Sequence, residues 1–228
     1  MPWLKHKSRR RPRILFITGT DTGVGKTVAT FALAVLFKKK GLSVGVMKPV
    51  QCGGQDAQFL KTKLALKEDL REINPYYAPE PLSPHLAFRR ARQKIEVATI
   101  FRTLIRLCQE HDVLLIEGAG GLMVPLKTGY FNADLARDLK AELIIVARLG
   151  LGTINHTLLT IQQARRSRLR VRGVLFSDTN PGPKSIPEQT NPAEIRRLSG
   201  IRVLGTIPYL KAKTEQDVLR QCRNIQLE

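Results

Sequence analysis

Short apolar runs alternate with helical patterns along most of the chain. Each run is dominated by Val, Ile and Leu with few polar positions, which is typical of strands covered on both faces of a parallel sheet. We expect six strands, at Arg13–Thr18, Ser43–Met47, Val113–Glu117, Leu143–Ala147, Val171–Phe176 and Arg202–Thr206.

The segments between these runs have helical spacing. Lys26–Lys40 is apolar nearly all round, which predicts a buried helix, and it ends in three lysines followed by Gly41, a typical C-terminal signal. Further helices are expected at Asp56–Leu66, Glu96–Glu110, Asn132–Leu139, Asn155–Ser167, Pro192–Leu198 and Glu215–Cys222, with proline-rich loops at Asn74–Pro84 and Thr179–Pro192. The alternation predicts βαβ units and an α/β fold class: one doubly wound, mostly parallel sheet with helices on both faces, in a single domain over residues 14–228.

The turn between the first strand and the first helix reads GTDTGVGKTV, from Gly19 to Val28. Its glycines let backbone N–H groups converge on an anion, and the following helix adds the positive end of its dipole. In this context Gly-Lys-Thr indicates a nucleoside triphosphate site of the P-loop type, with Lys26 on the β- and γ-phosphates and Thr27 on Mg²⁺. The spacing departs from the standard pattern, because Thr20 stands where the first glycine is usual and Gly19 lies one position earlier.

Charged residues follow two other strands at the sheet edge where doubly wound folds bind ligands. Glu117 ends an apolar run and precedes a glycine-rich stretch, and Asp56 opens a predicted helix, where it could equally complement the helix dipole. With Thr27 these acids make a suitable oxygen set for Mg²⁺. Lys48 ends the second strand. A second cation facing the γ-phosphate suggests an anionic acceptor, such as a carboxylate or a carbamate, and the alternative is a solvated lysine.

Composition adds further constraints. Of 228 residues, 43% are hydrophobic and 25% charged, as in ordinary globular proteins. No run is long enough to span a membrane, and the basic extension at residues 1–13, expected to fray, lacks the apolar segment of a secretion signal, so we expect a cytoplasmic protein. The cysteines, Cys52, Cys108 and Cys222, have no metal or redox spacing.

The formal net charge of +19 would favour nucleic acid or anionic membranes as partners. The arginines gather at residues 9–13, 89–92 and 165–172, but no aromatic residues are interleaved with them and no DNA-binding spacing accompanies them. We therefore predict neither a nucleic-acid partner nor a membrane partner.

Other segments complete a series of motifs with the phosphate loop. They are Lys48-Pro49-Val50, Asn74-Pro75-Tyr76 with Ser83-Pro84-His85, Glu117-Gly118-Ala119-Gly120-Gly121, Ile154-Asn155-His156, and Ile207-Pro208-Tyr209-Leu210. Taken in this order, the six motifs resemble those of the dethiobiotin synthetases, ATP-dependent carboxylases of biotin synthesis. The resemblance runs from Ile14 to about Leu210.

The resemblance implies a reaction in which 7,8-diaminononanoate, CO₂ and ATP give dethiobiotin, ADP and phosphate through a carbamate and a carbamic-phosphoric mixed anhydride. It implies that Lys26 neutralises the β- and γ-phosphates, Lys48 holds the carbamate and Thr22 lies beside the diamine. It assigns Mg²⁺ to Thr27, Asp56 and Glu117. It assigns the nucleotide to Gly23, Val24, Gly25, Lys26, Thr27, Val28, Glu117, Gly118, Gly120, Gly121, Ser177, Asp178 and Pro208. It implies a homodimer in which Cys52 lies near the substrate and the partner subunit receives the substrate's carboxylate tail on the segment with Leu151, Gly152, Thr153 and Asn155.

Two positions depart from the family pattern. Cys52 stands where a serine or threonine hydroxyl is usual, and because a thiol is a weaker donor we expect weaker substrate binding without loss of the chemistry. Ser177-Asp178 replaces the asparagine that reads adenine, which leaves Asp178 or Asn180 to contact the base and leaves the base preference open.

Two other classes share the expected fold. Partition and septum-placement ATPases carry a signature lysine five residues before the invariant one, and here that position is Asp21, which cannot supply a cation. ATP-dependent amidating enzymes of cobalamin synthesis normally carry a fused glutaminase domain, for which 228 residues leave no room.

Overall fold

The computed structural model describes residues 12–227, and at its centre lies a parallel sheet with the strand order β10-β9-β8-β1-β5-β2. Its strands are β1 (Arg13–Gly19), β2 (Val44–Met47), β5 (Val113–Gly121), β8 (Glu142–Ala147), β9 (Arg170–Ser177) and β10 (Val203–Ile207). All six predicted strands are present. The chain passes from β1 to the edge strand β2 and returns to β5 beside β1. It then crosses to β8 on the other side of β1 and moves outward through β9 and β10, so the doubly wound fold is confirmed.

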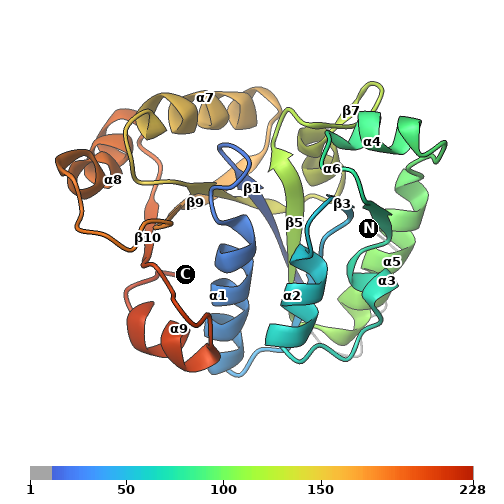
Figure 1. Cartoon of the computed structure of the whole chain (residues 1–228), viewed down its shortest axis with the longest axis horizontal. Helices are drawn as coiled ribbons and strands as arrows, with labels where there is room; N and C mark the ends of the chain where they lie inside the picture. Colours follow the sequence, from blue (N-terminus) through green and yellow to red (C-terminus); the bar gives the residue numbers. More distant parts are fainter. Residues whose placement is uncertain (1–11, 228) are drawn as a thin grey trace.

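Side chains of the central strands alternate between two hydrophobic layers. In β1, Leu15 and Ile17 pack with one layer and Phe16 with the other. The first layer is closed by α1 (Lys26–Lys39), α2 (Asp56–Lys63) and α9 (Glu215–Gln221), and the second by α4 (Pro84–Arg90), α5 (Val97–Glu110), α6 (Asn132–Asp138), α7 (Thr153–Arg166) and α8 (Ile186–Ser199) (Figure 1). The all-round apolar pattern of α1 is explained, since its residues from Ala29 to Phe37 are buried.

The predicted loop Thr179–Pro192 is wrong over its second half, because α8 begins at Ile186. Pro187 lies in the first turn, where a helix residue needs no N–H partner, and therefore favours this start. Ser185 precedes the helix and forms a capping box with Glu188, whose carboxylate accepts from the Ser185 backbone N–H at 2.8 Å. The helix prediction Pro192–Leu198 therefore began six residues too late. Likewise, α7 begins at Thr153, two residues before the predicted start.

The other predicted loop, Asn74–Pro84, also contains regular structure. Its strand β4 (Tyr76–Ala78) pairs in parallel with β3 (Val50–Cys52), and α4 begins at Pro84. The hairpin of β6 (Pro125–Lys127) and β7 (Tyr130–Phe131) and the short helix α3 (Leu70–Ile73) were not predicted either. These elements are too short to show a periodicity.

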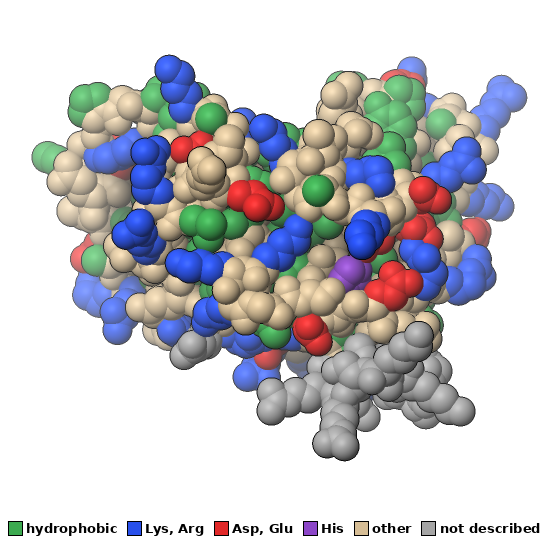
Figure 2. Space-filling view, turned by 90° about the horizontal axis from the view of Figure 1, so that it is seen from below, with side chains coloured by type: hydrophobic (Ala, Val, Ile, Leu, Met, Phe, Trp, Pro, Cys, Tyr) green, Lys and Arg blue, Asp and Glu red, His purple; other side chains and the backbone are tan. Residues whose placement is uncertain are grey.

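The charged surface is mixed where it can be seen. On the face in Figure 2, Lys and Arg side chains spread over much of the surface and are interleaved with acidic and apolar side chains. Residues 1–11, most of the predicted basic extension, lie outside the described residues, and Arg13 is the first residue of β1. Within residues 12–227, no helix has both the length and the apolar character needed to cross a membrane.

Candidate active site

A cavity of about 870 Å³ opens beside the carboxyl ends of β1, β2 and β5. Its walls come from the phosphate loop, the start of α1, the β3–α2 segment, the β4–α4 segment and the glycine-rich end of β5. The lining residues are Thr22, Gly23, Gly25, Lys26, Thr27, Val28, Lys48, Gln51, Cys52, Gln55, Asp56, Phe59, Pro81, Leu82, Ser83, Pro84, Glu117, Ala119, Gly120, Val124 and Lys213.

The phosphate loop joins β1 to α1 and depends on two glycines. Gly25 has φ +90°, and a Cβ there would lie 2.2 Å from Ser177 Oγ. A Cβ on Gly19 would lie 2.6 Å from the carbonyl oxygen of Asp21. Gly19 therefore does for this loop what the usual first glycine does one position later: it lets the backbone turn back on itself.

Lys26 directly follows this loop, as the first residue of α1, and is 7% exposed. Its ammonium donates to the carbonyl oxygen of Asp21 at 3.0 Å. Burial lowers the pKa of Lys26, and the nearby Glu117 carboxylate acts in the opposite direction. A phosphate in the loop would offer this ammonium a full negative charge in place of a neutral carbonyl.

Lys48 follows β2 and forms the centre of a charged cluster. Its Nζ lies 2.6 Å from Asp56 Oδ2 and 2.6 Å from Glu117 Oε1. The Glu117 side chain is fully buried, whereas Asp56, the first residue of α2, is 44% exposed. Burial alone would lower the pKa of Lys48, but the two carboxylates outweigh it and the pKa is raised. The alternative of a solvated strand-end lysine is thus wrong.

The three oxygen ligands predicted for Mg²⁺ converge on the same point. Thr27 Oγ1 donates to Glu117 Oε1 at 2.9 Å, and the same oxygen accepts from Lys48, which also holds Asp56. A hydroxyl and two carboxylates are the donors that a hard divalent cation prefers, so these residues fit Mg²⁺. Sequence reasoning missed Thr30, whose hydroxyl donates to Glu117 Oε2 at 3.0 Å; its spacing from Thr27 on one helix face was the available signal.

Two buried amides hold the segments that carry the charged cluster. Asn74 donates to the backbone carbonyl of Lys48 at 2.7 Å. Gln51 accepts from the backbone N–H of Ala57 at 3.0 Å and donates to two carbonyls of the turn before α2. These bonds fix the approach of Asp56 to Lys48, and neither amide was predicted to have this role.

Several residues predicted to bind the nucleotide lie outside the cavity lining. They are Val24, Gly118, Gly121, Ser177, Asp178 and Pro208. Ser177 packs against Gly25 behind the phosphate loop. The Asp178 carboxylate lies 2.5 Å from Lys184 Nζ and accepts from the backbone N–H of Asn180 at 3.0 Å, so the two candidate base readers contact each other.

The predicted substrate residues fall in two separate places. Cys52 lines the cavity, and burial raises the pKa of its thiol to about 11, which keeps it protonated near neutral pH. Leu151, Gly152, Thr153 and Asn155 lie at the start of α7 and do not line the cavity. Leu151 is 84% exposed, while Thr153 is buried and donates to the backbone carbonyl of Arg148 at 2.6 Å.

Comparison with known proteins places this site in a family. A family model described as an AAA domain matches residues 13–217. The ATP-dependent dethiobiotin synthetase BioD of Thermodesulfovibrio yellowstonii is 39% identical over 211 residues, which are 86% of this chain and 88% of that protein. This chain belongs to the ATP-dependent dethiobiotin synthetase family. Other synthetases agree: that of Bacillus cereus strain G9842 is 40% identical, covering 91% of this chain and 88% of its own length, and that of Nitrosopumilus maritimus is 34% identical, covering 86% and 89%.

Solved structures support the fold of this synthetase family member. The MinC:MinD cell division protein complex of Aquifex aeolicus matches with a TM-score of 0.56 at 16% identity, covering 90% of this chain and 86% of that one. A putative plasmid partition protein of Borrelia burgdorferi B31 bound to AMPPNP matches with a TM-score of 0.58 at 19% identity, covering 93% and 98%. At these identities the likeness concerns architecture, and the synthetase sequences decide the family.

Proposed function

We propose that this chain converts 7,8-diaminononanoate, CO₂ and ATP to dethiobiotin, ADP and phosphate, with the cavity beside β1, β2 and β5 as its active site. Membership of the dethiobiotin synthetase family supports the overall reaction. One observation of the site carries the assignment: Lys26, at the start of α1, and Lys48, just after β2, both line a single cavity. This arrangement suits phosphoryl transfer between two anions.

Lys26 and the amides of the phosphate loop neutralise the β- and γ-phosphates. Phosphoryl transfer depends more on positioning and charge stabilisation than on covalent participation of the protein. Thr27, Asp56 and Glu117 would hold Mg²⁺, which supplies further neutralisation of the phosphate oxygens. Because Glu117 is fully buried and bonded by Thr27 and Thr30, its position is set before any ligand arrives.

Lys48 orients the acceptor. One amine of the diamine takes up CO₂ as a carbamate anion, and the Lys48 ammonium holds this anion against the γ-phosphate. Transfer of the phosphoryl group to a carbamate oxygen gives the mixed anhydride, and attack by the second amine closes the ring and releases phosphate. Thr22 lies on the same cavity wall, where its hydroxyl can contact the diamine, and Cys52 contributes a protonated thiol.

The remaining assignments complete this proposal. The base would extend toward the ends of β9 and β10. Ser177 and Asp178 lie at the end of β9, behind the phosphate loop, and Pro208 follows β10. The exposed start of α7, with Leu151 at its tip, suits a homodimer in which that segment receives the substrate tail of the other subunit. We also propose a cytoplasmic location, as the sequence predicts.

The decisive test compares Lys26→Ala and Lys48→Ala with Lys39→Ala in a coupled assay for dethiobiotin. Each of the first two substitutions should lower turnover roughly 10²–10³-fold, because each removes charge stabilisation from a closed site. Lys39 lies exposed at the far end of α1, so its variant should keep wild-type turnover. Near-normal dethiobiotin production by either cavity variant would refute the role given to that lysine. Running ATP, CTP and GTP side by side would settle the base preference.

A further inference from the structure

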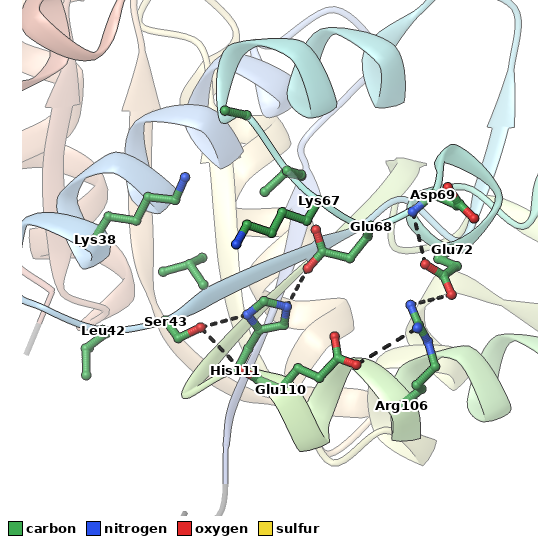
Figure 3. A pocket seen from close by; sticks show the side chains of 13 residues that line it. Lys38, Leu42, Ser43, Lys67, Glu68, Asp69, Glu72, Arg106, Glu110 and His111 are labelled. Carbon is green, nitrogen blue, oxygen red and sulfur yellow. Dashed lines mark hydrogen bonds and ion pairs between the residues drawn. The ribbon is translucent and has the colours of Figure 1, made fainter.

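A second cavity, of about 530 Å³, lies at the other end of the strands from the first, beside the amino ends of β2 and β5 (Figure 3). The loop between α2 and α3, the end of α5 and the segments that lead into these two strands enclose it. Its lining is mostly charged: Lys38, Leu42, Ser43, Val44, Ala65, Leu66, Lys67, Glu68, Asp69, Glu72, Arg106, Glu110 and His111.

Three possible metal ligands meet in this cavity. One ligand atom from each of Glu68, Glu110 and His111 lies within 4.8 Å of the other two. His111 Nε2 and Glu68 Oε1 are 2.6 Å apart, and Figure 3 shows both groups pointing into the cavity. The side chains of His111 and Glu68 are 13% and 8% exposed, while Glu110 is 51% exposed and leaves one side open to solvent.

The His111 ring is held from behind. Its Nδ1 lies 2.9 Å from Ser43 Oγ, and the same hydroxyl oxygen lies 3.3 Å from the Glu110 carbonyl oxygen. A Cβ on Gly45 would lie 2.5 Å from His111 Cδ2, so the ring rests directly against the strand backbone. A polar partner on the outer nitrogen, which orients the inner one, is the usual support of a metal-binding histidine.

Glu68 is held at both its side chain and its backbone. Its carboxylate Oε1 lies 2.6 Å from His111 Nε2. The backbone is fixed as well, because Lys61 donates to the Glu68 carbonyl oxygen. Three cationic side chains also line the cavity. Arg106 pairs with Glu72 and, at 3.9 Å, with Glu110, Lys38 donates to a backbone carbonyl at 2.7 Å, and Lys67 is the third.

We propose that Glu68, Glu110 and His111 form a binding site for a divalent transition-metal ion of the Zn²⁺ type, separate from the nucleotide site. An imidazole ligand favours such ions over Mg²⁺, and three protein ligands leave room for water as a fourth. Two ligand atoms at about 2.1 Å from one tetrahedral ion lie roughly 3.4 Å apart. The present 2.6 Å contact between His111 and Glu68 therefore has to widen by less than about 1 Å.

The two sites occupy opposite ends of the same three elements. Ser43 and Lys48 lie just before and just after β2. His111 lies shortly before β5 and Glu117 within it, about 20 Å apart for an extended chain. The α2 segment carries Asp56 at its start and is followed by Glu68. The donor chemistry differs accordingly: hydroxyl and carboxylate oxygens surround the nucleotide site, whereas the second cavity adds an imidazole nitrogen. A bound ion would tie the loop after α2 to the start of β5.

Two titrations of the full chain test this site. Calorimetry measures the binding of Zn²⁺, and visible absorption measures the binding of Co²⁺. We expect one ion per chain. The affinity should fall at least about tenfold in Glu68→Gln and in His111→Gln, and the Co²⁺ spectrum should change in His111→Gln. Asp56→Asn, in the nucleotide site, should bind the ion as wild type does. Failure of the wild-type chain to bind, unchanged affinity in His111→Gln, or loss of binding in Asp56→Asn or Cys52→Ser would overturn the proposal.

A third variant, Glu110→Gln, separates loss of Zn²⁺ binding from misfolding. Glu110 is half-exposed, and its substitution leaves the His111–Glu68 pair in place. This variant should match the thermal unfolding of the wild type in EDTA, yet bind Zn²⁺ at least about tenfold more weakly and gain less thermal stability from it. Wild-type Zn²⁺ affinity in Glu110→Gln would overturn the three-residue site.

Discussion

Removal of the Lys48 ammonium should destabilise the fold as well as stop the reaction. Lys48→Met keeps the length and apolar contacts of the side chain but leaves Glu117 without the cation 2.6 Å away. Both side chains are almost wholly buried, at 5% and 0% exposure, so water cannot replace the lost partner. Asp56 is 44% exposed and can be solvated, so it adds little to the loss.

Breaking a buried ion pair by removing one partner costs about 3–5 kcal/mol. The hydroxyls of Thr27 and Thr30 remain as donors to Glu117, which places the expected loss toward about 3 kcal/mol. With a urea dependence of about 3 kcal/mol per molar, the unfolding midpoint should fall by about 1 M.

A double-mutant cycle tests the cause of this loss. In Lys48→Met with Glu117→Gln the uncompensated charge is gone, so the double variant should be clearly more stable than the sum of the two single losses predicts. Urea unfolding followed by circular dichroism measures all four proteins, and the interaction free energy should exceed about 1 kcal/mol. Additive losses, or a Lys48→Met variant as stable as the wild type, would refute the ion pair as a source of stability.

Other substitutions probe different parts of the molecule. Cys52→Ser should keep wild-type turnover and bind the diamine equally or slightly more tightly in steady-state kinetics, since a hydroxyl is the better donor; an inactive variant would contradict the place given to Cys52. Gly25→Ala forces a Cβ to within 2.2 Å of Ser177 Oγ at φ +90°, so calorimetry should detect no ATP binding, and unchanged affinity would contradict the loop geometry. The lowered pKa of Glu68 contributes stability that is present above its ordinary value of 4.5 and is lost as the pH falls. In Glu68→Gln the free energy of unfolding should therefore fall less steeply below about pH 4.5. An unchanged pH dependence of this free energy would count against the contribution.

The sheet and the phosphate loop could be predicted because their signals are local. Each strand is a nearly continuous apolar run, and a Gly-Lys-Thr turn between a strand and a helix has one common use. Lys48 and Glu117 could also be placed at one edge, since parallel strands end on the same side. The family followed from six motifs in order, and the synthetase relatives confirm it.

Other features depend on contacts between distant segments, so sequence reasoning could not reach them. From the sequence, Asp56 at a helix start could equally bind Mg²⁺ or complement the helix dipole. It lies beside Lys48 because Gln51 holds the segment between β3 and α2. The prolines between residues 179 and 192 are typical loop signals, yet Pro187 favours the first turn of α8. Glu68 and His111 are 43 residues apart and meet only because β5 begins beside the loop that follows α2.

The register of β5 has a consequence for how this chain can change in length. Leu115 and Ile116 face opposite layers of the core, and Glu117 shares the side of Leu115, toward α1. One inserted or deleted residue within the strand would turn the carboxylate into the apolar layer beneath α5. Insertions should therefore accumulate in surface connections such as residues 179–185, while this strand keeps a constant length among homologues.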